Sequence, residues 1–206
     1  GLAGVGDLAF AEELYTRSLV INEKLAPDSL VVANALNNLG LLAAQRSDLA
    51  TAEELFGRSL AIKEKLAPAS LDVAESLNNL GEIASQRGDL DSAQQLFTRS
   101  LAIQEKRAPD SLVVAVTLKN LGDVARDRGD VTAERELHGR SLVLREKLAP
   151  HSLSVAEILI DLARAARNRN DLAAAEKSYL AALALWQWRA PRTTREAGGG
   201  LGLGWR

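Results

Sequence analysis

The sequence contains no cysteine and no methionine, and only 4% of its 206 residues are aromatic. Without cysteine, neither a disulfide framework nor a thiolate metal site can stabilise the fold. Only two histidines are present, so a zinc site of ordinary composition has few ligands, and we expect no metal and no cofactor. Because methionine is missing even at position 1, we interpret the chain as a piece of a longer protein.

No excess of either charge is present, because 25 Lys and Arg balance 27 Asp and Glu to a net charge of -2. A nucleic-acid-binding protein usually carries a basic surplus, so we expect no nucleic-acid partner. No run approaches the ~18 apolar residues of a membrane span, and the start lacks the features of a signal peptide, which predicts a cytoplasmic protein without membrane contact. The sequence also lacks a nucleophile elbow, a phosphate loop and an HExxH string, so we expect no enzyme activity.

What the sequence does contain is a repeat with a period of 41 residues. All five prolines follow that step, and five aspartates, each followed by Leu or Val, follow it too. The prolines are Pro27, Pro68, Pro109, Pro150 and Pro191, and the aspartates are Asp7, Asp48, Asp89, Asp130 and Asp171. A fixed period of this length is typical of stacked repeat proteins.

Each repeat unit is predicted to form two helices. Apolar residues in 49–66 recur at spacings near 3.6, with charged residues between them, as in an amphipathic helix. Asp48 is a good N-cap for this helix, and Pro68 stops it because proline disfavours helix in the residue before it. A further helix begins after Ser70, another good cap, and continues to about Arg87.

The residue that closes each unit is mostly glycine, which readily adopts the left-handed conformation common after a helix. Gly6, Gly88 and Gly129 share this position, Asn170 is the usual substitute, and Ser47 is the exception. We therefore expect about nine helices of ~17 to 19 residues.

The small and apolar residues of the units match a known pattern. They are Leu36, Leu39, Gly40, Ala43, Ala52, Phe56 and Ser59 in the first full unit, Leu77, Leu80, Gly81, Ala84, Ala93, Phe97 and Ser100 in the second, and Leu159, Leu162, Ala163, Ala166, Ala175, Tyr179 and Ala182 in the fourth. This pattern resembles the tetratricopeptide repeat. The longer period and the LNNLG segments resemble the extended repeats of kinesin light chains and their bacterial relatives.

The resemblance implies an all-α fold, a right-handed α-solenoid of antiparallel helix pairs. The array is expected to occupy residues 1–191, and residues 192–206 are interpreted as a Gly-rich flexible tail or linker. The expected units are a half repeat at 7–26 and full repeats at 30–67, 71–108, 112–149 and 153–190.

In this family the first helix of each pair, here called the A helix, lines a concave groove that binds peptides. Carried over by position, the resemblance implies a peptide-binding set of Asn34, Asn37, Asn38, Asn78, Asn79, Lys119, Asn120, Arg126, Arg164 and Arg167. Three of them, Asn38, Asn79 and Asn120, form an amide ladder at 41-residue spacing, and amides can pair with the backbone of an extended peptide. The alternative is that these side chains bond only to the neighbouring helix.

Two repeats depart from the pattern. The third has Glu134 where alanine is expected, which we expect to turn outward, and His138 where an aromatic residue is expected, which we interpret as a packing histidine. In the last repeat, Trp186 and Trp188 replace polar residues. These tryptophans either cover a chain end or are exposed, or they form an interface with a following domain or with the tail residues Leu201, Leu203 and Trp205.

The leading function is a scaffold for protein–protein interaction that binds a peptide or partner segment in the groove. A second hypothesis is the ligand-sensing or regulatory array of a larger bacterial signalling enzyme, such as a caspase-like protease or a signalling ATPase, whose catalytic domain lies outside this chain. A third is an architectural spacer.

Overall fold

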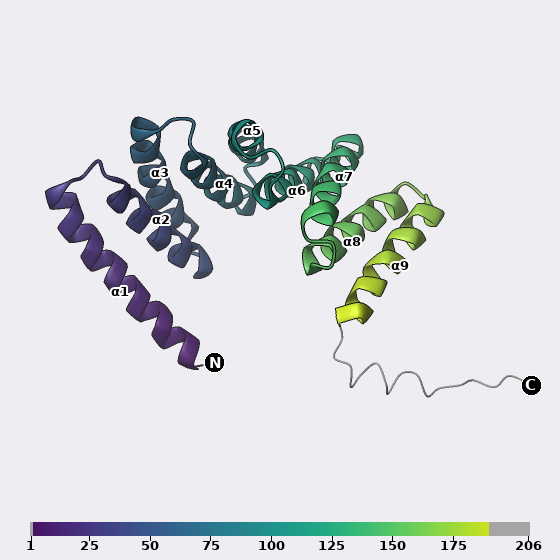
Figure 1. The fold of residues 1–206 in the computed structure, drawn as a ribbon, viewed down its shortest axis with the longest axis horizontal. Helices are drawn as coiled ribbons and strands as arrows, with labels where there is room; N and C mark the ends of the chain where they lie inside the picture. The colour runs from purple at the N-terminus through teal and green to yellow at the C-terminus, as the bar shows by residue number, and fades with distance from the viewer. Residues whose placement is uncertain (1, 190–206) are drawn as a thin grey trace, which may run out of the picture. The chain divides into compact units, whose positions relative to one another are not determined.

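The computed structural model describes the backbone of residues 2–189 and the side chains of residues 10–188, and within them every regular element is an α-helix (Figure 1). The helices are α1 (Leu2–Leu25), α2 (Leu30–Gln45), α3 (Leu49–Leu66), α4 (Leu71–Gln86), α5 (Leu90–Arg107), α6 (Leu112–Asp127), α7 (Val131–Leu148), α8 (Leu153–Asn168) and α9 (Leu172–Arg189). The predicted all-α fold class is confirmed.

The helices belong to two compact units, Gly1–Pro109 with α1 to α5 and Asp110–Arg206 with α6 to α9. In the first unit, α1 packs on α2, α2 on α3, α3 on α4 and α4 on α5. In the second unit, α6 packs on α7, α7 on α8 and α8 on α9. Within each unit, consecutive helices are therefore neighbours. The A helices of the full repeats are α2, α4, α6 and α8, and each is followed by a B helix.

The predicted N-caps start the helices. Asp48 Oδ1 accepts a hydrogen bond from the Thr51 N–H at 3.2 Å, and Asp89 Oδ1 accepts one from the Ser92 N–H at 3.1 Å. Hydrogen bonds from the Ser92 side chain and backbone hold the pKa of Asp89 below its ordinary value. Ser70 Oγ accepts from the Val73 N–H at the start of α4, so the residues that cap both kinds of helix are correctly predicted.

The unit-closing residues adopt the expected left-handed conformation. Their φ values are +62° for Ser47, +78° for Gly88, +77° for Gly129 and +61° for Asn170. Ser47 therefore holds a conformation that favours glycine. In each unit this residue lies in the turn between an A helix and the B helix that packs against it.

The first helix differs from the sequence-based expectation. The half repeat was expected to begin at Asp7 after Gly6, but α1 begins at Leu2 and contains both residues. Gly6 and Asp7 therefore lie within a helix and do not separate two helices. The other B helices have 18 residues and the A helices 16, so the A helices are slightly shorter than expected.

The core contains the residues that the repeat pattern places inside. Leu36, Leu77, Ala52 and Ala93 have no exposed surface, and Phe97 is 1% exposed. The apolar clusters join three consecutive helices. In one of them, Leu60 of α3, Leu77 of α4 and Ile103 of α5 pack together. Because such a cluster needs neighbouring helices to complete it, stability comes from stacking rather than from any one helix pair.

Small residues let the helices approach closely within each pair. A Cβ atom added to Gly81 would lie 2.6 Å from Phe97 Cε1, so the aromatic ring packs directly on the glycine backbone. Serines that stand 41 residues apart also join the two helices of a pair, since Ser100 Oγ of α5 donates a hydrogen bond to the Ala74 carbonyl oxygen of α4 at 2.7 Å. Ser59 and Ser141 make the same bond to Ala33 and Ala115.

Candidate functional site

The predicted peptide-binding residues of the first unit lie on α2 and α4 with different exposure. Asn34 is exposed, Asn38, Asn78 and Asn79 are partly buried, and Asn37 is buried. Asn79 Nδ2 donates to Asn37 Oδ1 at 3.0 Å, which joins the two A helices. One rung of the amide ladder therefore bonds to another A helix.

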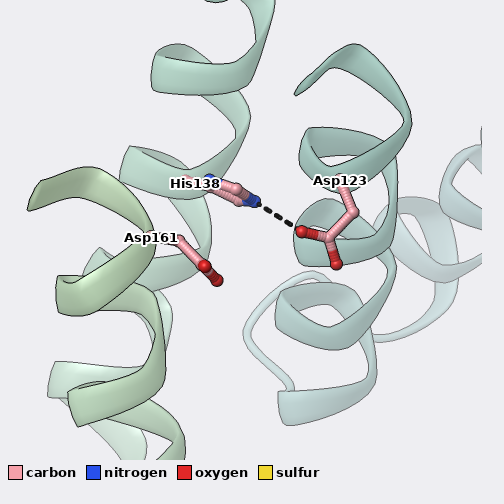
Figure 2. Close-up of side chains that lie close together, drawn as sticks. All are labelled: Asp123, His138 and Asp161. Carbon is pink, nitrogen blue, oxygen red and sulfur yellow. Dashed lines mark ion pairs between the residues drawn. The ribbon is translucent and has the colours of Figure 1, made fainter. Parts of the chain in front are cut away.

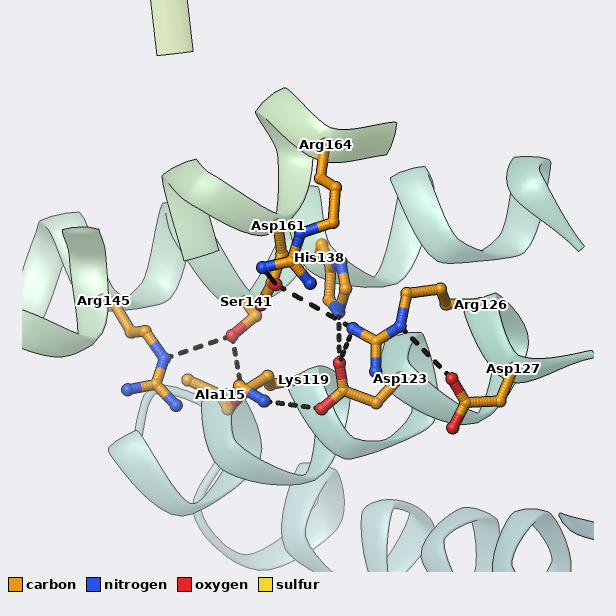
Figure 3. Close-up of polar contacts among 10 residues, drawn as sticks. All are labelled: Ala115, Lys119, Asp123, Arg126, Asp127, His138, Ser141, Arg145, Asp161 and Arg164. Atoms are coloured by element: carbon orange, nitrogen blue, oxygen red, sulfur yellow. Dashed lines mark hydrogen bonds and ion pairs between the residues drawn. The ribbon is translucent and has the colours of Figure 1, made fainter. Parts of the chain in front are cut away.

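In the second unit the same face of the A helices is charged. Lys119, Asn120 and Arg126 on α6 are partly buried, whereas Arg164 and Arg167 on α8 are exposed. Lys119 Nζ donates to Asp123 Oδ2 at 2.5 Å, and Arg126 Nη1 donates to Asp123 Oδ1 at 2.7 Å. Two of the predicted cations are thus held by one carboxylate (Figure 3).

That carboxylate is part of a cluster that sequence reasoning missed. Asp123 of α6, His138 of α7 and Asp161 of α8 point toward one another, and one ligand atom of each lies within 4.8 Å of the others (Figure 2). Counting histidines and cysteines could not find it, because two of its members are aspartates. The repeat pattern does indicate the cluster. Asp161 stands at the position where the amide ladder has asparagine, and His138 stands at the position where the other full repeats have phenylalanine or tyrosine.

His138 takes the buried aromatic position, as the interpretation of a packing histidine predicted. Its side chain has no exposed surface, and a Cβ atom added to Gly122 would lie 2.3 Å from His138 Cδ2. Unlike phenylalanine, imidazole carries two polar nitrogens, and neither has a hydrogen-bond partner within the described residues. The nearest carboxylate oxygen is Asp123 Oδ1, 3.4 Å from Nε2.

The electrostatics of this cluster favour ionised aspartate. Burial acts to raise the pKa of Asp123, but the contacts with His138, Lys119 and Arg126 outweigh burial and hold that pKa well below its ordinary value. Asp161 Oδ1 lies 3.8 Å from Arg126 Nη1 and 3.5 Å from Arg164 Nη2. Both carboxylates therefore lie within reach of cationic groups.

The expectation for Glu134 is wrong. Its side chain does not turn outward but is buried, with 4% of the residue exposed, in the position that holds alanine in the other full repeats. Burial raises the pKa of Glu134, and the neighbouring His138 and Arg126 oppose that effect. The inward position becomes possible because these groups and the cluster around Asp123 provide a polar environment inside the third repeat.

A comparison with models of protein families matches the tetratricopeptide repeat over residues 2–65 and 72–147, which is more than half of the chain. The chain belongs to the tetratricopeptide repeat family. The match includes the caps Asp48 and Asp89, the left-handed residues Ser47, Gly88 and Gly129, and the contact of Gly81 with Phe97.

Solved structures similar to the chain share its fold. The BtubC (BKLC) structure from P. vanneervenii is 23% identical, covers 99% of this chain and 79% of its own, and has a TM-score of 0.81. A kinesin-light-chain-type protein of Podosopora anserina with nearly identical TPR-like repeats is 20% identical, covers 91% and 92% of the two chains, and has a TM-score of 0.73. MamA is 16% identical, covers 91% and 93%, and has a TM-score of 0.66.

Among curated proteins, no sequence matches the chain. At these identities, the solved structures show the fold alone. The predicted tetratricopeptide repeat is confirmed by the family match, and the solved structures that share its fold include kinesin-light-chain-type repeats. Of the helices that the structure describes, none is long and apolar enough to span a membrane.

A second buried polar position repeats along the tetratricopeptide units. Lys63 is 1% exposed, and its Nζ donates to Ser76 Oγ at 3.0 Å and lies 3.8 Å from Glu75 Oε2. Burial lowers the pKa of Lys63, whereas Glu75 opposes that shift. One period later, Gln104 stands in the position of Lys63 and Val116 in the position of Glu75. An acid therefore accompanies this buried position only where the buried residue is a cation.

The last B helix, α9, has an exposed apolar face. Tyr179 is 39% exposed although its counterpart Phe97 is 1% exposed, and Trp186 and Trp188 are 51% and 52% exposed. The Trp188 ring stacks on His151, with ring centroids 4.2 Å apart. The tail residues Leu201, Leu203 and Trp205 lie outside the described residues.

Proposed function

We propose that the chain is a non-catalytic, cytoplasmic scaffold that binds an extended or helical segment of a partner protein along the faces of its A helices. Tetratricopeptide repeat proteins generally mediate contacts between proteins. The observation that carries the proposal is the repeated amide face on α2 and α4, where Asn34 is exposed and Asn38 and Asn79 are partly buried. Amide groups can donate to carbonyl oxygens and accept from N–H groups of a bound backbone.

The internal bond between Asn79 and Asn37 supports this role rather than replacing it. It uses one donor of Asn79 and fixes the orientation of the amide. A pre-oriented amide loses less conformational entropy when it binds a peptide, which favours affinity. The second unit adds charge, because Arg164 and Arg167 are exposed on α8. These guanidinium groups favour acidic residues in a segment that binds α8.

Affinity selection from a random peptide library on the full 206-residue chain tests the proposal. The ladder variant replaces Asn38, Asn79 and Asn120 by Ala, and the matched control replaces Gln94 and Gln95, exposed amides on the B helix α5. Peptides enriched on the wild type and the control but lost on the ladder variant support binding by the A-helix faces. No enrichment on the wild type contradicts it and favours the architectural spacer.

The exposed apolar face of α9 favours a second candidate, a regulatory array within a larger signalling protein such as a caspase-like protease or a signalling ATPase. Tyr179 and Leu183 of α9 are exposed, whereas Phe97 and Leu101, which hold the same positions in α5, are buried. The exposed face of α9 is therefore apolar in the way that is expected of a surface that packs against another helix. An adjoining segment that covered Trp186 would shift its fluorescence to shorter wavelength. Red emission that stays unchanged when residues 192–206 are deleted would show that the tail does not cover it.

A further inference from the structure

The cluster of Asp123, His138 and Asp161 lies entirely within the second unit and draws one side chain from each of three consecutive helices (Figure 2). The ligand atoms are two carboxylate oxygens and one imidazole nitrogen, all within 4.8 Å of one another. Carboxylate oxygen and neutral imidazole are both ligands of divalent transition metals. Asp161 is only 12% exposed and Asp123 only 20% exposed at the side chain, so the cluster is largely protected from solvent.

The second, independent observation is the state of His138. Its ring is completely buried, and both nitrogens lack a hydrogen-bond partner in the part of the chain that the structure describes. Buried polar groups in folded proteins are nearly always bonded, so an imidazole with no hydrogen bond, whose Nε2 only approaches Asp123 Oδ1 at 3.4 Å, needs a reason. Phe56 and Phe97 fill the same position without any polar atom, which shows that packing alone does not require histidine there.

The charges around the cluster already include three cations and a further acid. Arg126 Nη1 contacts Asp123 and approaches Asp161, Lys119 holds the other oxygen of Asp123, and Arg164 approaches Asp161 (Figure 3). Glu134 is buried close to His138 and Arg126. Arg126 thus places a cationic group between the two carboxylates. Its side chain is 32% exposed, and its Nε also lies 3.3 Å from the half-exposed Asp127.

We propose that Asp123, His138 and Asp161 bind one divalent transition-metal ion of the Zn²⁺ class, with Arg126 giving up its place between the two aspartates. Zinc bonds to nitrogen and oxygen are ~2.0–2.2 Å long and tetrahedral, so two ligand atoms on one ion are roughly 3.4 Å apart. The widest pair of ligand atoms must therefore close by up to roughly 1.4 Å. Lys119 can stay on Asp123 Oδ2, because the oxygen that faces His138 is Oδ1.

The bound ion acts as a cross-link between α6, α7 and α8. Three protein ligands leave a fourth position for water, and the imidazole nitrogen favours zinc over magnesium or calcium, which prefer oxygen alone. Arg126 would then remain paired with Asp127 at the surface. The stabilising effect of the ion is independent of whether the A helices bind a peptide.

The test uses the full chain without an added histidine tag, with ZnCl₂ in calorimetric titrations and CoCl₂ as a spectroscopic probe. We expect one ion per chain, visible absorption from cobalt with a nitrogen ligand, and a melting temperature raised by roughly 5–10 °C at a free Zn²⁺ concentration 100 times Kd. Arg126→Gln is expected to bind Zn²⁺ more tightly, because it removes the competing cation.

The decisive variants replace ligands by the residues of neighbouring repeats, so that folding is retained. His138→Phe and Asp161→Asn are each expected to weaken Zn²⁺ binding by roughly 100-fold or more, whereas His151→Ala, which removes the only other histidine, leaves it unchanged. Absence of saturable one-to-one binding to the wild type overturns the proposal. So does equal binding by the wild type and either ligand variant, each checked for helix content by circular dichroism.

Discussion

Alanine substitutions at two helical glycines, Gly81 and Gly57, are predicted to change stability in opposite directions. A Cβ atom at Gly81 of α4 would lie 2.6 and 2.8 Å from Phe97 Cε1 and Cδ1, whereas a Cβ atom at Gly57 of α3 meets nothing within 4 Å. Both changes improve helix propensity by about 0.5–1 kcal/mol. Only Gly81→Ala also forces a methyl group into a filled core.

The size of the steric cost decides the sign. Overpacking a core typically costs about 1–3 kcal/mol, and the Phe97 ring is 1% exposed and has little room to move. Gly81→Ala is therefore expected to destabilise the fold by about 1–2 kcal/mol after the propensity gain. Gly57→Ala is expected to stabilise it by about 0.5–1 kcal/mol. The resulting difference in melting temperature is about 3–12 °C for a chain of this length.

Thermal and urea unfolding followed by circular dichroism measures both variants. Because repeat arrays can unfold in parts, a second background makes the result independent of a two-state fit. With Phe97→Ala already present, the obstacle to the methyl group is gone, and adding Gly81→Ala should now raise stability. A Gly81→Ala variant as stable as Gly57→Ala in the wild-type background would refute the glycine–aromatic contact.

Three further predictions concern buried and capping polar groups. Ser100→Ala removes the bond to the Ala74 carbonyl and is expected to cost about 0.5–1.5 kcal/mol in urea unfolding; an unchanged midpoint would mean that this bond contributes nothing. Glu75→Val leaves the buried Lys63 without its acid and should destabilise the fold, whereas Lys63→Gln together with Glu75→Val, the residues of the next repeat, should recover roughly 0.5–3 kcal/mol. Strictly additive effects would contradict coupling between the two. The pKa of Asp89 is lower in the folded chain than its ordinary value near 3.8, so its contribution is present above that pH and is lost as the pH falls through the folded pKa. Melting temperatures between pH 6 and 2 should therefore depend less on pH in Asp89→Asn, and equal dependence in both proteins would count against this cap.

The parts of the fold that repeat could be predicted from the sequence because each unit confirms the others. The spacing of Pro68 and Asp48 predicted where helices end and begin, and the shared closing position predicted left-handed residues at Gly88, Gly129 and Asn170. Ser47, the exception in sequence, adopts the same conformation. The start of α1 at Leu2 was missed because the closing position predicted a helix end at Gly6, whereas Gly6 lies inside α1.

Side-chain contacts between repeats were harder to predict. The sequence placed Asn79 correctly on an A helix but could not reveal its bond to Asn37, which depends on how two A helices approach each other. The cluster of Asp123, His138 and Asp161 draws on three helices, and only its register positions signal it. Glu134 turns inward because of those same neighbours.

The most direct test of the scaffold assignment is to observe the side-chain amide signals of the chain by nuclear magnetic resonance while a library-selected peptide is added. If the A helices bind the peptide, the signals of Asn38 and Asn79 shift with saturation at one peptide per chain, while those of Gln94 and Gln95 on α5 stay in place. Saturable shifts confined to the B-helix amides, or none at any amide, would contradict recognition by the A-helix faces.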